Sequence, residues 1–331
     1  MNSMNKSWSK HGGISNPVTT TTTSSIDELL DTSNRPVSFG VSSDSIQGTT
    51  WGFPAPDKKM LIKTNGNPDY DTYISTVNRS YQVINNDEIL EPLHKQMINF
   101  FDPSVLNEVK IIDSMTKNAA RCYSEYQFPR ISRDLEAGNH KTSFQFRIIV
   151  KNTFDGSSQA MMYAGLIDMF CMNGNISGQF DVARARHSKN YNVDGFITIL
   201  GKSLDRFNAE MDLYQEYANR KLVSVSLVED LFKRLSSPSG EVREQKRDNT
   251  LSDKLFAQYG AESLVRGHNV FAVMSAMTHY ASHNDERFSL KSNADASSLY
   301  KRQDKVASWL SSKTWQDFVE TATKAPTLLN V

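Results

Sequence analysis

The pattern of apolar and polar positions is clearest between His140 and Phe154, where it repeats every two residues. One set of alternate positions is wholly apolar and the other is mostly polar or charged: Phe144, Phe146, Ile148 and Val150 against Gln145, Arg147, Ile149 and Lys151. Successive side chains of a strand point to opposite faces of a sheet. The pattern therefore predicts an antiparallel strand with one face in the core and the other toward solvent or a charged partner.

A hairpin is predicted just before this strand. Residues 109–115 and 119–128 form its two strands, and Lys117-Asn118 supplies the turn. On the second strand Arg121, Tyr123 and Glu125 share one face, while Cys122, Ser124, Tyr126 and Phe128 share the other. Further upstream, residues 81–84 predict a short strand. Asn85 and Asn86 then cap a helix that runs toward Phe101 and has Pro92 near its start.

An apolar run from Met161 to Met172 lies between two turn dipeptides, Asp155-Gly156 and Asn173-Gly174. Periodicity alone does not separate a buried strand from a short buried helix capped by Ser158. Aspartate-glycine and asparagine-glycine pairs are strong signals of hairpin turns, so the context favours strands on both sides. We expect this run to continue the sheet as a meander, with its turns at the edge of a binding surface.

The second half of the chain changes to a helical period. Residues 196–218 carry apolar side chains at a spacing of 3.6 for about six turns, and further helices are predicted at 227–235, 251–259, 269–283 and 304–323. Strands followed by helices predict an α+β fold, an antiparallel meander sheet packed by helices on one side, with a helical C-terminal half. We expect one domain over 68–331, with the sheet at about 80–180 and the helices at about 193–325.

The first 67 residues are rich in Ser, Thr, Asn and Gly and predict a mostly flexible N-terminal tail. One exception is Ser25-Ile26-Asp27-Glu28, which has capping-box spacing before Leu29 and predicts a short helix. Trp51 and Phe53, which are flanked by prolines, are expected to dock an extended segment onto the body.

The charge balance limits the function classes. The chain has 37 Lys plus Arg and 37 Asp plus Glu, so a polyanion site must come from local clustering. No apolar run reaches the length of a membrane span, and Lys6 and Lys10 precede no apolar signal core. Cys122 and Cys171 have no metal or redox spacing. We expect a cytoplasmic protein, in the host cell if the chain is viral, with no membrane contact, metal or cofactor.

Three kinds of catalytic site are conceivable, and each has a simpler explanation. Ser157, Ser158 or Cys171 with His187 would suit nucleophilic catalysis, but no G-x-S-x-G elbow is present and the serines fit a turn. His279 and His283 have metal-ligand spacing on a predicted helix, but helix-capping or core roles explain them more simply. Phosphate-binding glycine motifs are absent from the sequence.

A basic constellation remains. Cations fall on the predicted strands and on the connection that enters the long helix: Arg121, Arg130, Arg133, Lys141, Arg147 and Lys151, then Arg184, Arg186, His187 and Lys189. Tyr123, Tyr126, Phe128 and Tyr191 are interleaved and have rings that suit base stacking. A solvated charged face paired with Glu125, Asp134 and Glu136 explains the same residues equally well on composition alone.

Several blocks resemble the phage and plasmid-like domain-of-unknown-function family with series number 932. They are "YQVINNDEILEPL", "IVKNTFDGSSQAMMYAGLIDMFCMNGNISG", "RHSKN" and "NVFAVMSAMTHYASH". The matching residues include Asn152, Asp155, Gly156, Ser157, Ser158, Cys171, Asn173 and Gly174, and Arg186-His187-Ser188 matches with Ser in place of Thr. The family's strand-strand-strand-helix order is similar to the core of viral single-strand annealing recombinases, an analogy of fold that does not fix function.

These observations predict a viral or plasmid protein that binds single-stranded DNA and acts in annealing or recombination without catalysis. Arg121, Arg147, Lys151, Arg184, Arg186 and Lys189 would neutralise phosphates, and Tyr123 or Tyr191 would stack bases. His187 would donate to a phosphate or orient the loop. Homo-oligomers would align several sites along one strand. The alternatives are an enzyme that uses the Asp155–Ser158 turn with His187, and a structural or host-interaction protein.

Overall fold

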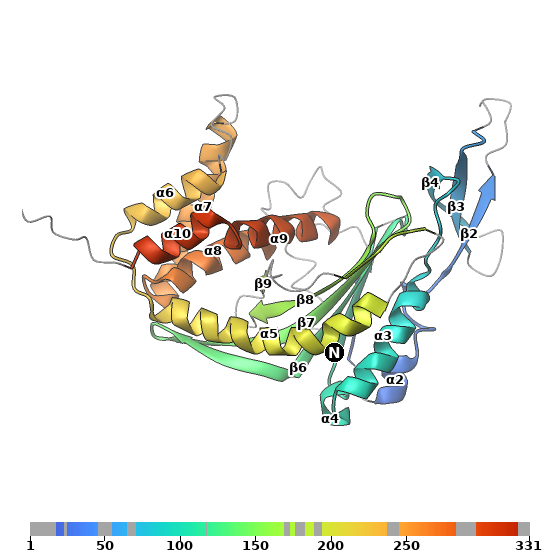
Figure 1. The fold of residues 1–331 in the computed structure, drawn as a ribbon, viewed down its shortest axis with the longest axis horizontal. Coiled ribbons are helices and arrows are strands. Elements are labelled where there is room, and N and C mark those ends of the chain that lie inside the picture. The colour runs from blue at the N-terminus through green and yellow to red at the C-terminus, as the bar shows by residue number, and fades with distance from the viewer. Residues whose placement is uncertain are drawn as a thin grey trace, which may run out of the picture.

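A computed structural model of the chain describes residues 18–22, 25–45, 55–64, 71–116, 118–168, 173–175, 183–188, 194–236, 245–282 and 296–323. Its main sheet is antiparallel, with the strand order β1-β5-β6-β7-β8-β10, and β9 also pairs with β8 (Figure 1). The strands are β1 (Val18–Thr22), β5 (Lys110–Met115), β6 (Arg121–Ala137), β7 (His140–Thr153), β8 (Ala160–Asp168), β9 (Asn173–Asn175) and β10 (Ala183–Ala185). The predicted α+β class, with a meander sheet and a helical C-terminal half, is confirmed.

The β6–β7 hairpin forms the centre of this sheet. Its register pairs Arg121 with Thr153 and Ala137 with His140, with one irregularity between Phe128 and Ser132. The predicted alternation in β7 is confirmed, since Phe144, Phe146, Ile148 and Val150 are all buried in the main core. At the closing turn, Gly138 has a φ of 63°, and a Cβ there would lie 2.8 Å from the Arg266 backbone. The positive φ and the close approach of the Arg266 backbone both require glycine at this position.

The apolar run after Asp155-Gly156 forms a strand, as the turn signals favoured. Gly156 has a φ of 68°, which suits a glycine, and β8 then pairs with β7 from Met161 to Asp168. The prediction for Asn173-Gly174 is wrong, because both residues lie within β9 and pair with Asp168 and Ile167. Strand pairing there takes priority over the turn preference of the dipeptide.

Helix α5 (Asp194–Asn219) packs across one face of the sheet, called here the α5 face. The Phe207 ring lies 6.0 Å from that of Phe146, and the Tyr214 ring lies 5.6 Å from that of Phe144. Such aromatic contacts add to the burial of apolar area. The 3.6-residue period of the sequence therefore predicted both the helix and the side that it buries.

Helix α3 (Asn86–Phe100) begins at the expected cap, followed by the short α4 (Pro103–Leu106). The Glu88 carboxylate accepts from the Asn85 backbone amide at 3.0 Å, which satisfies a free amide at the helix start. The predicted strand at 81–84 is wrong. The Tyr81 amide instead donates to the Asn78 carbonyl in a turn, and β4 (Thr72–Asn78) ends before it.

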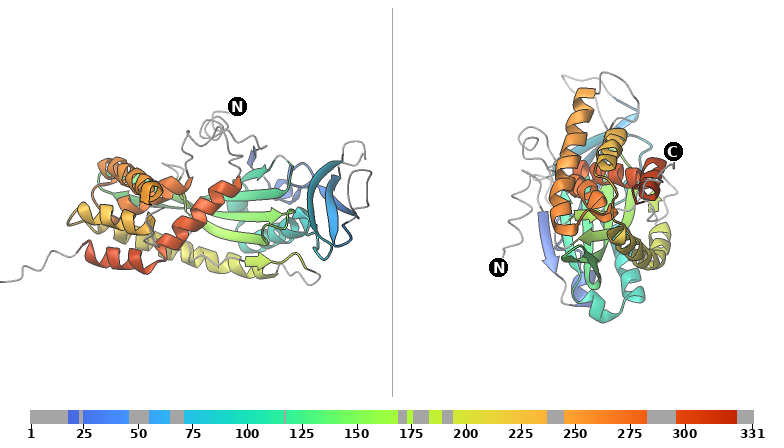
Figure 2. Two further views of the ribbon diagram at one scale, coloured as in Figure 1. Left: turned by 90° about the horizontal axis from the view of Figure 1, so that it is seen from above. Right: turned by 90° about the vertical axis from the view of Figure 1, so that its left-hand side faces the viewer.

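The C-terminal half contains α6 (Ser226–Ser236), α7 (Gln245–Arg266), α8 (Val270–Ser282), α9 (Ala296–Leu310) and α10 (Lys313–Thr321). The helix predicted over 304–323 is divided in two, because Ser312 has extended backbone angles and its Oγ accepts from the Trp315 amide. A second correction concerns the layers. Gln303 of α9 contacts Arg147, on the face opposite α5, so helices cover both faces (Figure 2).

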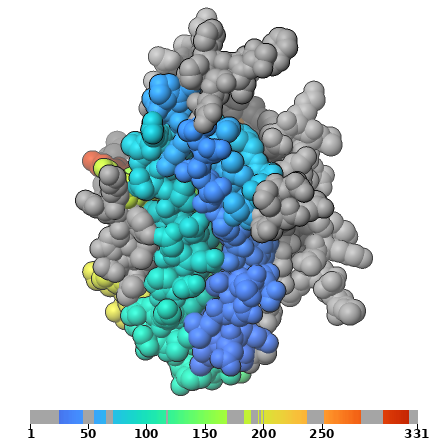
Figure 3. Space-filling view, turned by 90° about the vertical axis from the view of Figure 1, so that its right-hand side faces the viewer, coloured from blue at the N-terminus to red at the C-terminus, as the bar shows by residue number. Residues whose placement is uncertain are grey.

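Part of the N-terminal segment belongs to the fold. Helix α2 (Ile26–Leu30) has the predicted cap, with the Ser25 side chain accepting from the Glu28 amide. Strands β2 (Gly40–Ser45), β3 (Lys58–Thr64) and β4 form a second antiparallel sheet. Residues 25–38 lie along α3, as Figure 3 shows in dark blue beside teal, and the Asn86 side-chain amide donates to the Val37 carbonyl. The expectation of a mostly flexible tail does not hold for these residues, and Trp51 and Phe53 lie outside the described ones.

Candidate nucleic-acid interface

The face of the sheet opposite α5, called here the α9 face, carries most of the predicted site residues. Paired residues of neighbouring antiparallel strands point to the same side. Tyr123 pairs with Lys151, Lys151 pairs with Met161, and Met161 pairs with Arg184. A single row therefore crosses four neighbouring strands from β6 to β10. The sequence predicted the face of each residue within its own strand, and the register supplies the alignment between strands.

Aromatic side chains in the middle of the α9 face are closed to solvent. Tyr123, Ile149 and Tyr163 form a small apolar cluster and are 1%, 1% and 3% exposed, with Met161 packed against them. The Tyr163 hydroxyl donates to the Met161 sulfur at 3.1 Å. Burial, and secondarily the negative charge of Asp304, raise the pKa of Tyr163. The prediction that Tyr123 stacks on bases is therefore contradicted in this conformation.

Arg147 is also buried, contrary to its predicted contact with phosphate. Its side chain is 3% exposed, and its Nη1 donates to Glu125 Oε1 at 3.2 Å. The Gln127 amide donates to the same oxygen at 3.0 Å, and Arg147 Nη2 donates to Gln303 Oε1 at 3.4 Å. A buried arginine with a carboxylate partner is a structural link. Here it joins the sheet to α9.

Four other cations remain at one end of the α9 face. Arg121 lies two residues before Tyr123 and Arg186 two residues after Arg184, so these four residues are called the cationic stripe: Arg121, Lys151, Arg184 and Arg186. Arg184 and Arg186 are exposed, Lys151 is half-buried, and the Arg121 side chain is 27% exposed. Three strand spacings of about 4.8 Å make the stripe roughly 14 Å wide.

Two carboxylates partly balance the stripe. Arg121 Nε donates to Asp155 Oδ2 at 2.8 Å. Asp304, on α9, interacts electrostatically with Lys151 and Arg184: loss of hydration raises the pKa of its carboxyl, and the two cations oppose that rise. Among the described residues, the interactions named here set four cations against two carboxylates, a local excess of positive charge that would suit an anion although the whole chain is neutral.

His187 is held by the connection between β4 and α3. Its ring stacks on Tyr81 with 4.5 Å between centroids, and its Nδ1 lies 3.1 Å from the Gln82 carbonyl oxygen. The Gln82 amide donates back to the His187 carbonyl at 3.2 Å. Burial lowers the pKa of His187, so the ring is neutral at pH 7. These contacts suit a role in orienting the loop.

The turn that matches the family blocks, residues 152–158 and called here the family turn, makes hydrogen bonds at both of its ends. Asn152 is 2% exposed, and its amide donates to the Ile84 carbonyl and to Asn86 Oδ1 at 2.8 and 2.9 Å. Asp155 accepts from the Ser157 amide at 2.9 Å. Burial tends to raise the pKa of Asp155, but the bonds from Ser157 and Arg121 outweigh it and lower the pKa. The motif therefore ties β7 to the start of α3 and to the stripe.

This turn does not form a nucleophilic site among the described residues. Ser158 Oγ donates to the Gln159 carbonyl, and no hydrogen bond joins His187 to Ser157, Ser158 or Asp155 there. A nucleophile needs a base within hydrogen-bond reach. Within the same described part of the chain, no three His, Cys, Asp or Glu side chains gather as a metal site would require. Lys189, Tyr191, Cys171 and His283 lie outside it.

A second polar cluster was missed by the sequence reasoning. Arg35 forms a bidentate pair with Asp113 at 2.8 and 2.6 Å and donates to the Tyr126 hydroxyl at 2.7 Å. His94 Nε2 also lies 2.7 Å from that hydroxyl. Burial, and then the charge of Arg35, lower the pKa of His94 to about 3. Arg35 lies in a Ser- and Asn-rich segment with no periodicity, so no local signal pointed to it.

Comparison with known proteins gives a family and no activity. A family model described as a domain of unknown function (DUF932) matches residues 73–309. No curated protein and no solved structure matches the chain. Across the described residues no helix is both long and apolar enough to span a bilayer. The matched range runs from β4 to α9 and includes the whole cationic stripe, and the chain belongs to the DUF932 family.

Proposed function

We propose that this chain binds single-stranded DNA through the cationic stripe, without catalysis, as a phage or plasmid protein that supports annealing or recombination. The observation that carries the proposal is the register that brings Lys151 and Arg184 into one row, with Arg121 and Arg186 beside them. Cations aligned on one face neutralise successive phosphates and release counterions. The site needs no nucleotide and no metal for this.

The fold supports the same proposal by analogy. Apart from the short strands β9 and β10, the strands β6, β7 and β8 are followed along the chain by α5, which packs across them. This strand-strand-strand-helix order is the feature shared with annealing recombinases, and fold order alone does not fix function. The analogy is the reason for choosing single-stranded DNA as the ligand, and the stripe provides the cations that would contact its phosphates.

Salt dependence gives the first quantitative expectation. Each phosphate neutralised on a single strand contributes about −0.7 to the slope of log affinity against log salt, so four contacts give about −2.8. A fourfold rise in salt would then weaken binding by about 50-fold. The measurement is fluorescence anisotropy of a labelled single-stranded oligonucleotide at several salt concentrations, with duplex DNA as a competitor.

A double variant tests the stripe itself. Lys151→Gln/Arg184→Gln should weaken binding and reduce the magnitude of the slope by about 1.4. The matched control, Arg130→Gln/Lys141→Gln, removes two exposed cations of the same hairpin that pair with Glu108 and Asp134. It should bind like the wild-type chain. Wild-type protein that fails to bind at low salt, or equal losses in both variants, would refute the proposal.

A further inference from the structure

Residues 25–38, called here the strap, lie along α3 and insert side chains into the body of the protein (Figure 3). Leu29 and Val37 are completely buried, and the Arg35 side chain is 8% exposed. The other residues of the strap are exposed or half-buried. The strap is therefore a surface segment whose attachment depends on a few enclosed contacts.

Arg35 makes the charged part of this attachment. Its Nη1 donates to the Tyr126 hydroxyl at 2.7 Å, and the same nitrogen lies 3.3 Å from His94 Nε2. The guanidinium also pairs with Asp113, which accepts in addition from the Ser124 hydroxyl at 2.7 Å. A buried ion pair therefore holds the strap to the sheet, and a histidine ring from α3 lies against the cation of that pair.

The hydrogen bonds of this cluster require a neutral His94. The Tyr126 hydroxyl accepts from Arg35, which leaves its own proton for His94 Nε2, 2.7 Å away. Nε2 is then the acceptor, and the ring proton is on Nδ1, which is buried without a hydrogen-bond partner among the described residues. A second proton, on Nε2, would remove the acceptor and place another cation 3.3 Å from the guanidinium.

A second positive charge at this place would be poorly compensated. Asp113 on β5 is already paired with Arg35, and Tyr126 on β6 is uncharged because burial raises its pKa to about 12. Asp87 on α3 acts electrostatically on Tyr126. Within the described chain, no ionisable side chain of α2, α4 or α5 makes a hydrogen bond or ion pair with His94, which is completely buried. A buried charge without its own partner is strongly unfavourable.

We propose that protonation of His94 releases the strap from α3 while the main sheet stays folded. In the released state the ring is hydrated and binds a proton at its ordinary pKa of about 6.5. The closed strap is therefore favoured above about pH 6.5, and each pH unit below that value shifts the equilibrium toward release by about tenfold. Release would uncover Leu29 and Val37, so the protein would present an apolar surface in acid. No step involves nucleic acid.

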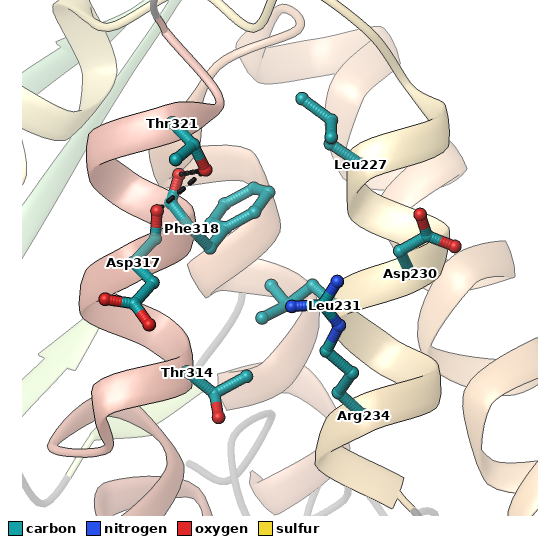
Figure 4. A pocket seen from close by; sticks show the side chains of 8 residues that line it. All are labelled: Leu227, Asp230, Leu231, Arg234, Thr314, Asp317, Phe318 and Thr321. Atoms are coloured by element: carbon teal, nitrogen blue, oxygen red, sulfur yellow. Dashed lines mark hydrogen bonds between the residues drawn. The ribbon is translucent and has the colours of Figure 1, made fainter.

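The groove between α6 and α10 has the opposite arrangement of charges and supplies a reference. Arg234, Asp230 and Asp317 border a space of about 230 Å³ there, and all three residues are exposed (Figure 4). Exposed charges keep their hydration, so the local opening of α6 or α10 hydrates none of these groups anew. Both helices lie at the other end of the molecule from the strap, and their opening leaves His94 enclosed.

Hydrogen exchange followed by mass spectrometry tests the release in the full chain. Between pH 7 and about pH 5.5 the opening constant of the strap amides, corrected for the intrinsic exchange rate, should rise by about 8-fold. The amides of α6 and α10 should not show this rise. Strap amides that open no more readily than those of the buried helix α8 at about pH 5.5, or an equal rise in all segments, would overturn the proposal.

Two variants assign the effect to one ring. His94→Gln keeps a polar end toward the Tyr126 hydroxyl and binds no proton, so the rise should disappear. The control His268→Gln removes an exposed histidine whose Nδ1 lies 2.9 Å from the Tyr259 hydroxyl, and it should keep the full rise. Circular dichroism checks that both variants fold, and the wild-type measurement tests the release without them. A rise that persists in His94→Gln would also overturn the proposal.

Discussion

Arg147 and Lys151 lie four residues apart on the same face of β7, and the structure gives them opposite surroundings. Arg147 is enclosed by Glu125, Gln127 and Gln303, and its side chain is 3% exposed. Lys151 is half-buried at the end of the same face, in a row with Arg184. A strand period assigns both cations to one surface. Part of the enclosure of Arg147 comes from Gln303 of α9, more than 150 residues later in the chain, which no strand period can predict.

The difference shows how the cations predicted from the sequence divide into two groups: those that stabilise the fold and those that are accessible to a ligand. A buried cation has lost its hydration and depends on a fixed partner, so its removal affects folding. A cation with access to water depends little on any neighbour, so its removal affects what binds there. Burial and partner distances therefore separate the roles of Arg147 and Lys151, which are equivalent in the sequence.

The largest expected effect is on stability at Arg147. Arg147→Met leaves Glu125 buried without its cation and should lower the free energy of unfolding by about 3–5 kcal/mol. Lys151→Met should lower it by no more than about 1 kcal/mol, the upper end expected for a hydrated ion pair such as that with Asp304. Urea denaturation of both variants measures the contrast. If both variants lost the same free energy of unfolding, Arg147 could not be distinguished from Lys151 as the structural cation.

A second contrast lies within the family turn. Asn152→Ala removes the donor to the Ile84 carbonyl and to Asn86, and leaving buried polar groups without partners should cost about 1–3 kcal/mol. Ser157→Ala keeps the backbone amide that donates to Asp155, and its exposed side chain should matter by less than about 0.5 kcal/mol. The same urea titration tests both. A larger loss at Ser157 would indicate that the hydrogen bond of its hydroxyl to Asp155 contributes more than an exposed hydrogen bond usually does.

The buried cluster of Arg35, Asp113, His94 and Tyr126 should make the stability of the fold depend on pH, which the exposed cations should not. The pKa of His94 is lowered to about 3, below its ordinary value of about 6.5, so the unfolded chain binds a proton that the folded chain does not. Stability should therefore fall as pH decreases below about 6.5, by about 1.4 kcal/mol per unit from this group. Urea midpoints at pH 7 and about pH 5.5 measure the loss.

Replacing the imidazole isolates its contribution. His94→Gln keeps a polar end toward the Tyr126 hydroxyl and should lose less stability between the two pH values than the wild-type chain does. His187→Gln serves as the control. The pKa of His187 is also lowered by burial, but its ring is only half-buried, so the effect should be smaller. An unchanged pH dependence in His94→Gln would show that other groups cause it.

Local patterns predicted the main sheet and most helices because their signals lie within a few residues. The period of two in β7, the helix capped by Ser25 and the period of 3.6 in α5 are each confirmed. The break at Ser312 is local too, but its serine cap interrupts a pattern that otherwise reads as one helix. Element types were therefore more predictable than element ends.

The parts that the sequence did not predict depend on contacts between distant segments. Tyr123 is buried among side chains of β7 and β8, Arg147 is contacted by α9, and Arg35 reaches Asp113 from a segment whose composition predicts a flexible tail. The alignment of Lys151 with Arg184 required the register of three strands. Strand periodicity gives the face of a residue but not its neighbours across the sheet. The sequence therefore named the cations of the stripe but did not show that they lie side by side.

The smallest effect concerns the carboxylate that α9 places near the open end of the face. Asp304 interacts with Lys151 and Arg184, the two cations proposed to hold phosphate, and therefore competes with the ligand. Asp304→Asn should raise affinity for single-stranded DNA by about 2- to 5-fold, the size expected for one charge near a hydrated surface. Asp205→Asn on α5 removes the same charge from the opposite side and should leave affinity nearly unchanged. Equal gains in both variants would assign the effect to net charge, and a gain only at Asp304 would show that α9 limits access to Lys151 as it closes off Arg147.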